Sequence, residues 1–420
     1  MRRRVLLSAY YCSPYRGGEA AVGWNVASGL AKYHDVTVLC GDLSAEAPTG
    51  QDIARIKSEQ GLPEGLEIHH LQAAGLARKI HDLHALPGLW FLYYKAYRRW
   101  QLQALELARK LHAEKPFDLV HHLNVIGFRE PGYLWQMGIP FFWGPVSGAP
   151  MVPPSFFDDF SPKERFRWRS RNLVNRLQIR RGGRPALAAG AATKVWAVSR
   201  EDCEMIRGWG VTAEPMLETG CFAPGSRPPR SLSTGEPLRI CWSGLFQGIK
   251  ALPVVLRAVA ALRSQGAGCV LEVLGDGPEA AAWKALAESL GLAGRVRWHG
   301  MLPRERALAL MSSSHVLAHS SVKEGTPHVV LEALPMGLPV ICHDACGMGT
   351  AVTPACGIKV PLENPARSVE GFREAIESFI SSPHLLEELS RGALARAAEL
   401  TWDSKIQHID RAYRDALGSP

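Results

Sequence analysis

Residues 323–335 read Lys-Glu-Gly-Thr-Pro-His-Val-Val-Leu-Glu-Ala-Leu-Pro and follow an apolar run that ends near His319. In this stretch Thr326 can cap a helix that has Pro327 at its first position. The start of such a helix offers free backbone amides and the positive end of a dipole, which suits a phosphate. The stretch therefore predicts a strand, a loop and a helix that together form one edge of a ligand site.

Two acids lie in the same stretch, Glu324 in the predicted loop and Glu332 in the predicted helix. Glu332 comes one turn after His328 and shares its face of the helix. Acids at this spacing are common, so the residues alone fit either a binding site or a capped helix whose acids face solvent.

Short apolar runs alternate with helical patterns on both sides of this stretch. Buried strands that alternate with helices predict a parallel sheet with helices on both faces. Residues 222–237, which are rich in Pro, Gly and Ser, interrupt the alternation before it restarts, so they are predicted to link two domains. The predicted strands are Val5–Tyr10, Val36–Cys40, Asp118–His122, Ile139–Trp143, Lys194–Ser199, Leu238–Ser243, Cys269–Leu274, Arg295–His299, His315–His319 and Leu338–His343.

The composition is that of an ordinary globular protein. Of 420 residues, 46% are hydrophobic and 21% charged, which excludes a disordered chain, a collagen-like chain and a small disulfide scaffold. Lys and Arg number 48 against 40 acids, so the net charge is +8, which favours anionic partners.

Three features indicate a cytoplasmic protein. The nine cysteines show no Cys-x-x-Cys spacing and lie mostly in apolar runs, as buried reduced thiols do. The run Val5–Tyr11 is short and leads into Pro14 without a cleavage site, so it is predicted to be a strand and not a signal peptide. No stretch reaches the ~18 apolar residues of a membrane span.

The pattern Glu-Gly-Thr-Pro-x-x-x-x-Glu-Ala-Leu at 324–334, followed by Gly-Leu-Pro-Val-Ile at 337–341, resembles the two-glutamate signature of retaining glycosyltransferases of family 4. The loop from Ser243-Gly244 to Ile249-Lys250 is similar to that family's donor-diphosphate loop. The resemblance also includes residues 274–278 and Thr401-Trp402, and it spans most of the chain.

This resemblance implies an α/β protein of the GT-B fold, in which two Rossmann-like, doubly wound parallel-sheet domains face each other across a cleft. It implies an N-terminal acceptor-side domain over residues 1–221 and a nucleotide-sugar-binding domain over residues 238–400. The last helix, residues 401–420, would cross back to the N-terminal domain.

The resemblance also implies roles on the donor side. Glu332 would hold the ribose hydroxyls, Glu324 would face the donor sugar and Lys250 would neutralise the diphosphate. The chain departs from the family at Leu245, where an arginine is usual, so either another basic residue such as Arg16 supplies that charge or the donor site is altered. The predicted donor-binding residues are Gly17, Gly18, Gly244, Lys250, Thr326, Pro327, His328 and Glu332; no metal ligands are predicted.

The family has a histidine near the donor sugar at the end of the strand that matches Asp118–His122. His121 and His122 both remain candidates, because neighbouring strand residues face opposite sides of a sheet. The candidate catalytic residues are Glu324, His121, His122 and Lys250. The acceptor-side candidates are Arg16, Glu19 and Arg129, although Arg129 is expected to pair with Glu130.

A basic run extends from Lys163 to Arg184 and holds nine basic residues against one acid, Glu164. Residues 89–100 are likewise aromatic and basic. Such stretches suit an anionic membrane surface, at about 1 kcal/mol per basic residue, whereas the plainer alternative is a solvated helix face together with aromatic residues of the core. No nucleic-acid recognition motif accompanies them.

We therefore predict a retaining, metal-independent glycosyltransferase without a cofactor. It would move a sugar from a nucleotide-diphospho-sugar to a hydroxyl of a glycan or lipid-linked acceptor. It would act in the cytoplasm, with the inner face of the membrane as a candidate surface and no nucleic-acid partner. The alternatives are another GT-B chemistry, such as a nucleotide-sugar epimerase, and a non-catalytic binding partner, which Leu245 favours.

Overall fold

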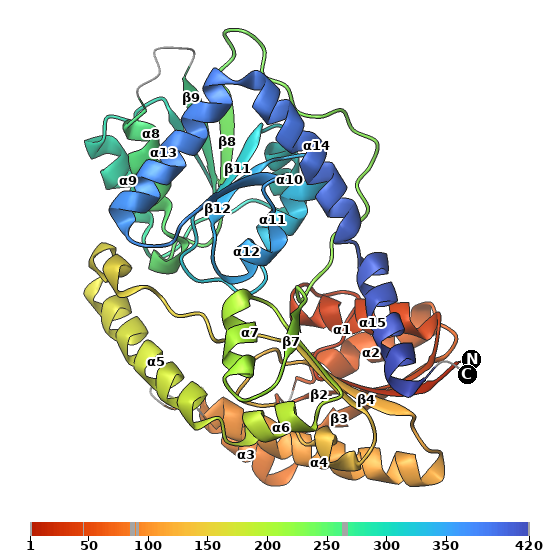
Figure 1. Ribbon diagram of the computed structural model, residues 1–420. Coiled ribbons are helices and arrows are strands. Elements are labelled where there is room, and N and C mark those ends of the chain that lie inside the picture. The colour runs from red at the N-terminus through yellow and green to blue at the C-terminus, as the bar shows by residue number, and fades with distance from the viewer. Residues whose placement is uncertain (1, 45, 85–88, 90–91, 263–267, 419–420) are drawn as a thin grey trace.

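The computed structural model describes residues 2–44, 46–84, 89, 92–262 and 268–418. Two parallel sheets organise the chain, one built from its first half and one from its second (Figure 1). Segments that follow the strands of one sheet contact segments that follow the strands of the other. For example, Thr350 Oγ1 donates a hydrogen bond to Val198 O at 2.9 Å, and the amide of Cys346 donates to Glu201 Oε1 at 3.0 Å.

The first sheet has seven parallel strands in the order β3-β2-β1-β4-β5-β6-β7. Alternate residues of its strands enter two separate cores, since Leu6 packs on one face and Leu7 on the other. Its strands are β1 (Arg4–Ala9), β2 (Asp35–Asp42), β3 (Leu66–Gln72), β4 (Leu119–Asn124), β5 (Phe141–Val146), β6 (Lys194–Ala197) and β7 (Ala213–Pro215). Its helices are α1 (Glu19–Ala31), α2 (Pro48–Glu59), α3 (Gly75–His84), α4 (Leu92–Glu114), α5 (Pro162–Arg181), α6 (Arg184–Ala191) and α7 (Arg200–Arg207).

The second sheet has six parallel strands in the order β10-β9-β8-β11-β12-β13. The strand order reverses between β8 and β11, so the loops after these two strands border a crevice where α/β sheets bind ligands. Its strands are β8 (Leu238–Ser243), β9 (Cys269–Leu274), β10 (Val296–Gly300), β11 (Val316–His319), β12 (Val340–His343) and β13 (Gly357–Val360). Its helices are α8 (Leu252–Ala260), α9 (Ala280–Ser289), α10 (Arg304–Ser312), α11 (His328–Ala333), α12 (Cys346–Ala351), α13 (Pro365–Ser381) and α14 (Pro383–Glu399).

The last helix, α15 (Trp402–Leu417), packs on α1 beside the first sheet (Figure 1). Its side chains Ile409 and Tyr413 belong to the same core as Val5 of β1. Two backbone hydrogen bonds tie its start to the segment that leaves the first sheet. The amide of Cys221 donates to Leu400 O at 2.8 Å, and that of Trp402 donates to Cys221 O at 3.1 Å.

A second crossing is formed by residues 150–168, here called the crossing segment. All of its aromatic side chains except Phe166 lie in the core of the second sheet, although the segment comes between β5 and β6 of the first. Polar contacts reinforce this packing, because Arg257 pairs with Asp159 at 3.0 Å and Ser155 Oγ donates to Glu363 O at 2.8 Å. Helix α5 then returns along the outside of both halves (Figure 1). The buried aromatic residues are Phe156, Phe157, Phe160 and Trp168.

Most predicted strands agree with the structure, but one is misplaced, and β3, β7 and β13 were not predicted. The strand expected at Ile139–Trp143 runs over Phe141–Val146 instead. For the aromatic residues of 89–100 the core alternative is confirmed at Tyr97 and Trp100, which are fully buried against Tyr10. Trp90 and Phe91 of that stretch lie outside the described residues.

All nine cysteines are free and buried, as the sequence predicted. Among the helices that the structure describes, we find none with the length and apolar character needed to span a bilayer.

Candidate active site

The loops after β8 and β11 bring Lys250 and Glu324 together. Lys250 ends a short 3₁₀ helix, Gly248–Lys250, and its Nζ donates a hydrogen bond to Glu324 Oε2. Ser321 Oγ donates to the same oxygen at 3.4 Å, and His319 Nε2 lies 3.7 Å from it. Burial, together with the neighbouring Lys250, holds the pKa of His319 well below its usual range, so the ring is neutral. The loops therefore present one cation and one carboxylate, both partly accessible.

Helix α11 begins one residue later than expected. Its first residue is His328, preceded by Pro327, and no side chain caps it. The expectation that Thr326 caps this helix is wrong, because Thr326 Oγ1 accepts a hydrogen bond from the amide of Glu218 at 2.9 Å. Thr326 thus joins the second sheet's loop to the segment that leaves the first.

Glu332 lies on the same helix and faces an arginine that sequence reasoning missed. Arg304, at the start of α10, donates to Glu332 Oε1 at 2.5 Å. Both side chains remain accessible, so the Glu332 carboxylate can exchange this contact for a ligand hydroxyl.

The loop after β8 depends on two glycines. Gly244 donates its amide to Leu274 O at 3.0 Å, and a Cβ on Gly275 would lie 1.9 Å from Gly244 O. Gly275 also has a φ of 127°, which side chains rarely adopt. The exposed Leu245 follows Gly244 in this loop. The Gly248 amide donates to Glu164 Oε2 of the crossing segment at 3.1 Å, a contact that the sequence did not predict.

The glycine pair after β1 borders open space. Gly18 precedes α1 with a φ of 61°, and no atom lies within 4 Å of a Cβ added at Gly17 or Gly18. Arg16 is already engaged, because its Nε pairs with Asp52 Oδ2 at 2.5 Å. Glu19 accepts a hydrogen bond from the amide of Ile126 at 3.1 Å, and burial raises its pKa.

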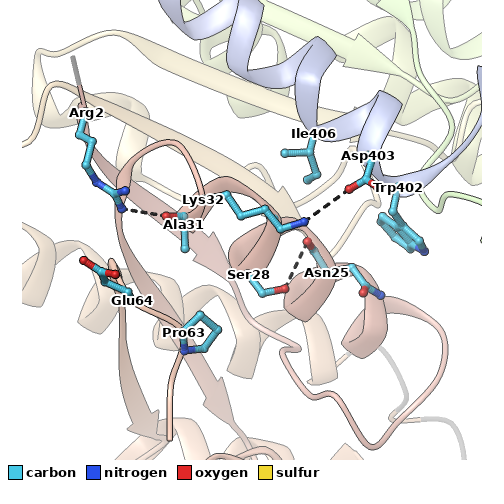
Figure 2. A pocket seen from close by; sticks show the side chains of 11 residues that line it. Arg2, Asn25, Ser28, Ala31, Lys32, Pro63, Glu64, Trp402, Asp403 and Ile406 are labelled. Carbon is cyan, nitrogen blue, oxygen red and sulfur yellow. Dashed lines mark hydrogen bonds and ion pairs between the residues drawn. The ribbon is translucent and has the colours of Figure 1, made fainter.

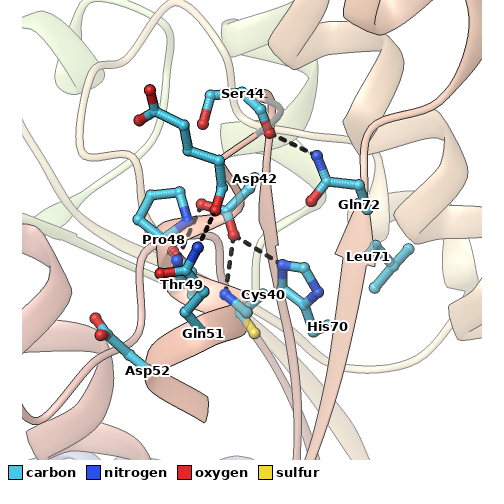
Figure 3. Close-up of polar contacts among 12 residues, drawn as sticks. Cys40, Asp42, Ser44, Pro48, Thr49, Gln51, Asp52, His70, Leu71 and Gln72 are labelled. Carbon is cyan, nitrogen blue, oxygen red and sulfur yellow. Dashed lines mark hydrogen bonds and ion pairs between the residues drawn. The ribbon is translucent and has the colours of Figure 1, made fainter. Parts of the chain in front are cut away.

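The neighbouring loop after β2 is fixed by Asp42 (Figure 3). Its carboxylate accepts hydrogen bonds from the amides of Thr49 at 3.2 Å and Gly50 at 3.0 Å, and contacts His70 Nε2 at 2.8 Å. Burial alone would raise the pKa of Asp42, yet these hydrogen bonds lower it below its ordinary value. The charged Asp42 therefore holds the start of α2, the helix that carries the partner of Arg16.

His121 and His122 are both buried in the central strand β4, which corrects the expectation of a histidine beside the donor sugar. The ring of His121 hydrogen-bonds Tyr413 Oη at 2.6 Å and Gly144 O at 2.8 Å. Burial lowers the pKa of His121 to about 4 and that of His122 to about 3, so both rings are neutral. Layers on both faces cover this strand, and neither ring has surface for a ligand.

Arg129 does not pair with Glu130, contrary to the sequence expectation. Glu130 contacts Arg98 at 2.6 Å and also pairs with Arg184. Arg129 instead donates to Asn175 Oδ1 and, at 2.6 Å, to Gln178 Oε1, both on α5. Among the described residues, no carboxylate pairs with Arg129.

Glu218 is a buried acid that the sequence did not single out, since it stands in an irregular segment. Burial raises its pKa, and the nearby Glu19 raises it further. Lys405 of α15 is also buried, which lowers its pKa, and its Nζ donates to Leu217 O. Glu218 and Lys405 are far apart in sequence, but they lie close together where the two halves join.

A cavity of about 460 Å³ lies elsewhere, at the far end of α1 from Gly18 (Figure 2). Its cations are occupied, because Arg2 pairs with Asp35 at 2.9 Å and Lys32 with Asp403 at 3.5 Å. None of the candidate residues lines this cavity, so it is separate from the candidate site. Within the described ranges, no group of three or more His, Cys, Asp and Glu side chains is arranged to hold a metal ion.

Comparisons with known proteins agree with this architecture. Residues 228–396 match the family described as glycosyl transferases group 1. The D-inositol 3-phosphate glycosyltransferase of Acidothermus cellulolyticus is 31% identical over 216 residues, which cover 48% of this chain and 47% of that protein. The chain thus spans about half the length of the curated relatives it matches.

Two solved structures extend the likeness to the whole chain. The apo form of the lipopolysaccharide outer core galactosyltransferase WaaB has a TM-score of 0.65 at 16% identity, and the match covers 97% of this chain and 98% of that one. Anabaena Alr3699/HepE in complex with UDP has a TM-score of 0.58 at 13% identity, covering 97% and 98%. At such identities the likeness concerns the fold, which is GT-B, as the sequence predicted.

Proposed function

We propose that the protein transfers a sugar from a nucleotide-diphospho-sugar to a hydroxyl of an acceptor, with retention of configuration. The match of residues 228–396 to glycosyl transferases group 1, within a GT-B fold, supports this proposal. The observation that carries the proposal is the pairing of Lys250 with Glu324 in the crevice between β8 and β11, with Glu332 on the adjoining helix. A cation and two carboxylates there match the needs of a diphosphate, a sugar and a ribose.

In this proposal the bond between the anomeric carbon and the diphosphate breaks, and the nucleoside diphosphate leaves with the bonding electrons. Lys250 neutralises the charge that develops on the leaving oxygen. Glu324 then exchanges its contact with Lys250 for the donor sugar. The acceptor hydroxyl attacks from the face the diphosphate has left, and its proton passes to that phosphate. Basic side chains supply the neutralisation, so the proposed reaction requires no metal.

Replacing Glu332 by Ala is expected to weaken nucleoside diphosphate binding by about 1.5–3 kcal/mol, because ribose hydroxyls lose a charged partner. Calorimetry with a panel of nucleoside diphosphates measures this change, and the best ligand of the panel identifies the base. Glu305→Ala is the matched control, since Glu305 is exposed in the first turn of α10. Equal affinity of Glu332→Ala and the parent would contradict the role of Glu332.

We further propose that helix α5 holds the protein against an anionic membrane surface, where it would meet a lipid-linked acceptor. The inner face of α5 is buried at Trp168, Asn172 and Asn175. The opposite face exposes Phe166 by 75% and Leu173 by 56%, and arginines flank this apolar stripe on both sides. An exposed apolar stripe between cations is complementary to an anionic bilayer surface. The proposal that the protein acts at the membrane surface depends on this exposed face of α5.

Replacing Phe166, Leu173 and Leu177 by Ser is expected to abolish sedimentation with liposomes that contain anionic lipids. The parent should sediment with these liposomes at low salt and much less at high salt, because part of the attraction is electrostatic. A control variant changes Leu102, Phe222 and Met301, which are also exposed but lie elsewhere, to Ser. Equal sedimentation of both variants, or none by the parent, would contradict the membrane role of α5.

A further inference from the structure

Cations that the proposed reaction does not use gather around one aromatic ring and one turn of backbone, and three of them, Arg129, Arg171 and Lys323, come from separate parts of the fold. Lys323 Nζ lies 5.9 Å from the centre of the Trp168 ring and Arg171 Cζ 5.6 Å from it, and Arg167 of the same helix as Arg171 lies at 5.7 Å. Lys323 also donates to Pro150 O. Arg129 reaches the same place through Asn175, which donates to Gly148 O at 3.0 Å and Ala149 O at 3.2 Å.

No carboxylate in the described parts of the chain forms an ion pair with any of these three side chains. The acid that acts on Lys323 is Asp202, whose oxygens are occupied by the amide of Ala149 at 2.8 Å and the hydroxyl of Ser199 at 2.7 Å. Burial raises the pKa of Asp202 to about 6. Burial lowers the pKa of Lys323, and both Arg171 and Arg129 lower it further. The cluster therefore carries an excess of positive charge.

The cluster borders the candidate active site. Lys323 immediately precedes Glu324 in the loop after β11. The next residue, Gly325, faces the first sheet, because a Cβ there would lie 3.9 Å from Ile126 Cδ1 and 3.9 Å from Ser147 Oγ. Two of the three cations belong to the first-sheet half, on the side where an acceptor is expected.

We propose that Arg129, Arg171 and Lys323 form a binding site for a phosphate group carried by the acceptor. Guanidinium groups bind phosphate through paired hydrogen bonds, and an ammonium adds a compact charge. The three like charges repel one another, and a bound phosphate would offset that repulsion. This site is separate from Lys250, which faces the donor through its contact with Glu324. The proposal rests on the proposed function and names an anionic class of acceptor.

The test is calorimetry of the full chain with inorganic phosphate at constant ionic strength. The parent is expected to bind phosphate, and Arg171→Gln to bind it at least tenfold more weakly. Arg171 is exposed, so this variant should fold. Arg180→Gln is the matched control, because it removes the same charge from α5 nine residues on, two and a half turns away and thus on the opposite side. Lys323→Met, checked for folding by circular dichroism, should weaken phosphate binding similarly.

A second titration with the best nucleoside diphosphate separates the two sources of phosphate. Unchanged nucleoside diphosphate affinity in Arg171→Gln supports an acceptor site. If that affinity falls and phosphate competes with the nucleotide, the cations serve the donor and the proposal is overturned, while the proposed function stands. No phosphate binding by the parent, or equal loss in Arg180→Gln, also overturns it. A parent that binds phosphate but no nucleoside diphosphate would contradict the proposed function and leave the anion site in place.

Discussion

Replacing Lys250 by Met is expected to slow the release of nucleoside diphosphate from the donor about 100- to 1,000-fold, the usual cost of losing one group that stabilises a developing negative charge. Lys250 is the cation that the structure places in the loop after β8, and the exposed Leu245 of the same loop supplies none. Arg16 cannot replace it without giving up Asp52. The rate is measured by coupled detection of nucleoside diphosphate, with excess chelator present throughout.

Lys284→Met is the control for this substitution, because Lys284 is exposed on α9 of the same half and should leave the rate unchanged. Release of nucleoside diphosphate at the parent rate by Lys250→Met would contradict the assigned role. A loss of parent activity that depends on the chelator would contradict the metal-free reaction.

Replacing Phe156 by Ala is expected to lower the free energy of unfolding by about 3–5 kcal/mol, the range for truncation of a buried phenylalanine. Phe156 is only 1% exposed and lies in the core of the second sheet. Urea unfolding followed by circular dichroism measures the change. Phe166→Ala, ten residues on at an exposed position, should change the unfolding free energy by less than about 0.5 kcal/mol. A loss in Phe156→Ala as small as that expected for Phe166→Ala would contradict the expectation that Phe156 stabilises the second half.

The sequence located strands well because buried parallel strands are apolar runs of limited length. Leu238–Ser243 and Cys269–Leu274 begin and end where the sequence predicts. The strand β5 was misplaced because Gly144 and Pro145 resemble a strand end. The pairing of β5 with β6 shifts register between Trp143 and Val146, and this irregularity accommodates the proline.

The site was predicted only where its residues share one motif. The loop with Glu324 and the helix with Glu332 were found because they adjoin in sequence. The pairs Arg171–Lys323 and Glu218–Lys405 were not, because the fold alone brings such distant residues together. Burial of His121 was equally hidden, since a strand-end histidine looks the same whether or not other layers cover it.

The crossing segment has a consequence for chimeric proteins. A chimera joined within residues 222–237 would import a foreign second sheet but retain Phe156, Phe157 and Phe160. These three side chains pack in the core of the native second sheet. The imported half would lose the aromatic residues that complete its own core. The three retained rings would pack against side chains that do not match them in shape. An exchange that keeps this core intact must therefore transfer residues 150–168 together with the second half, although the two segments are separate in sequence.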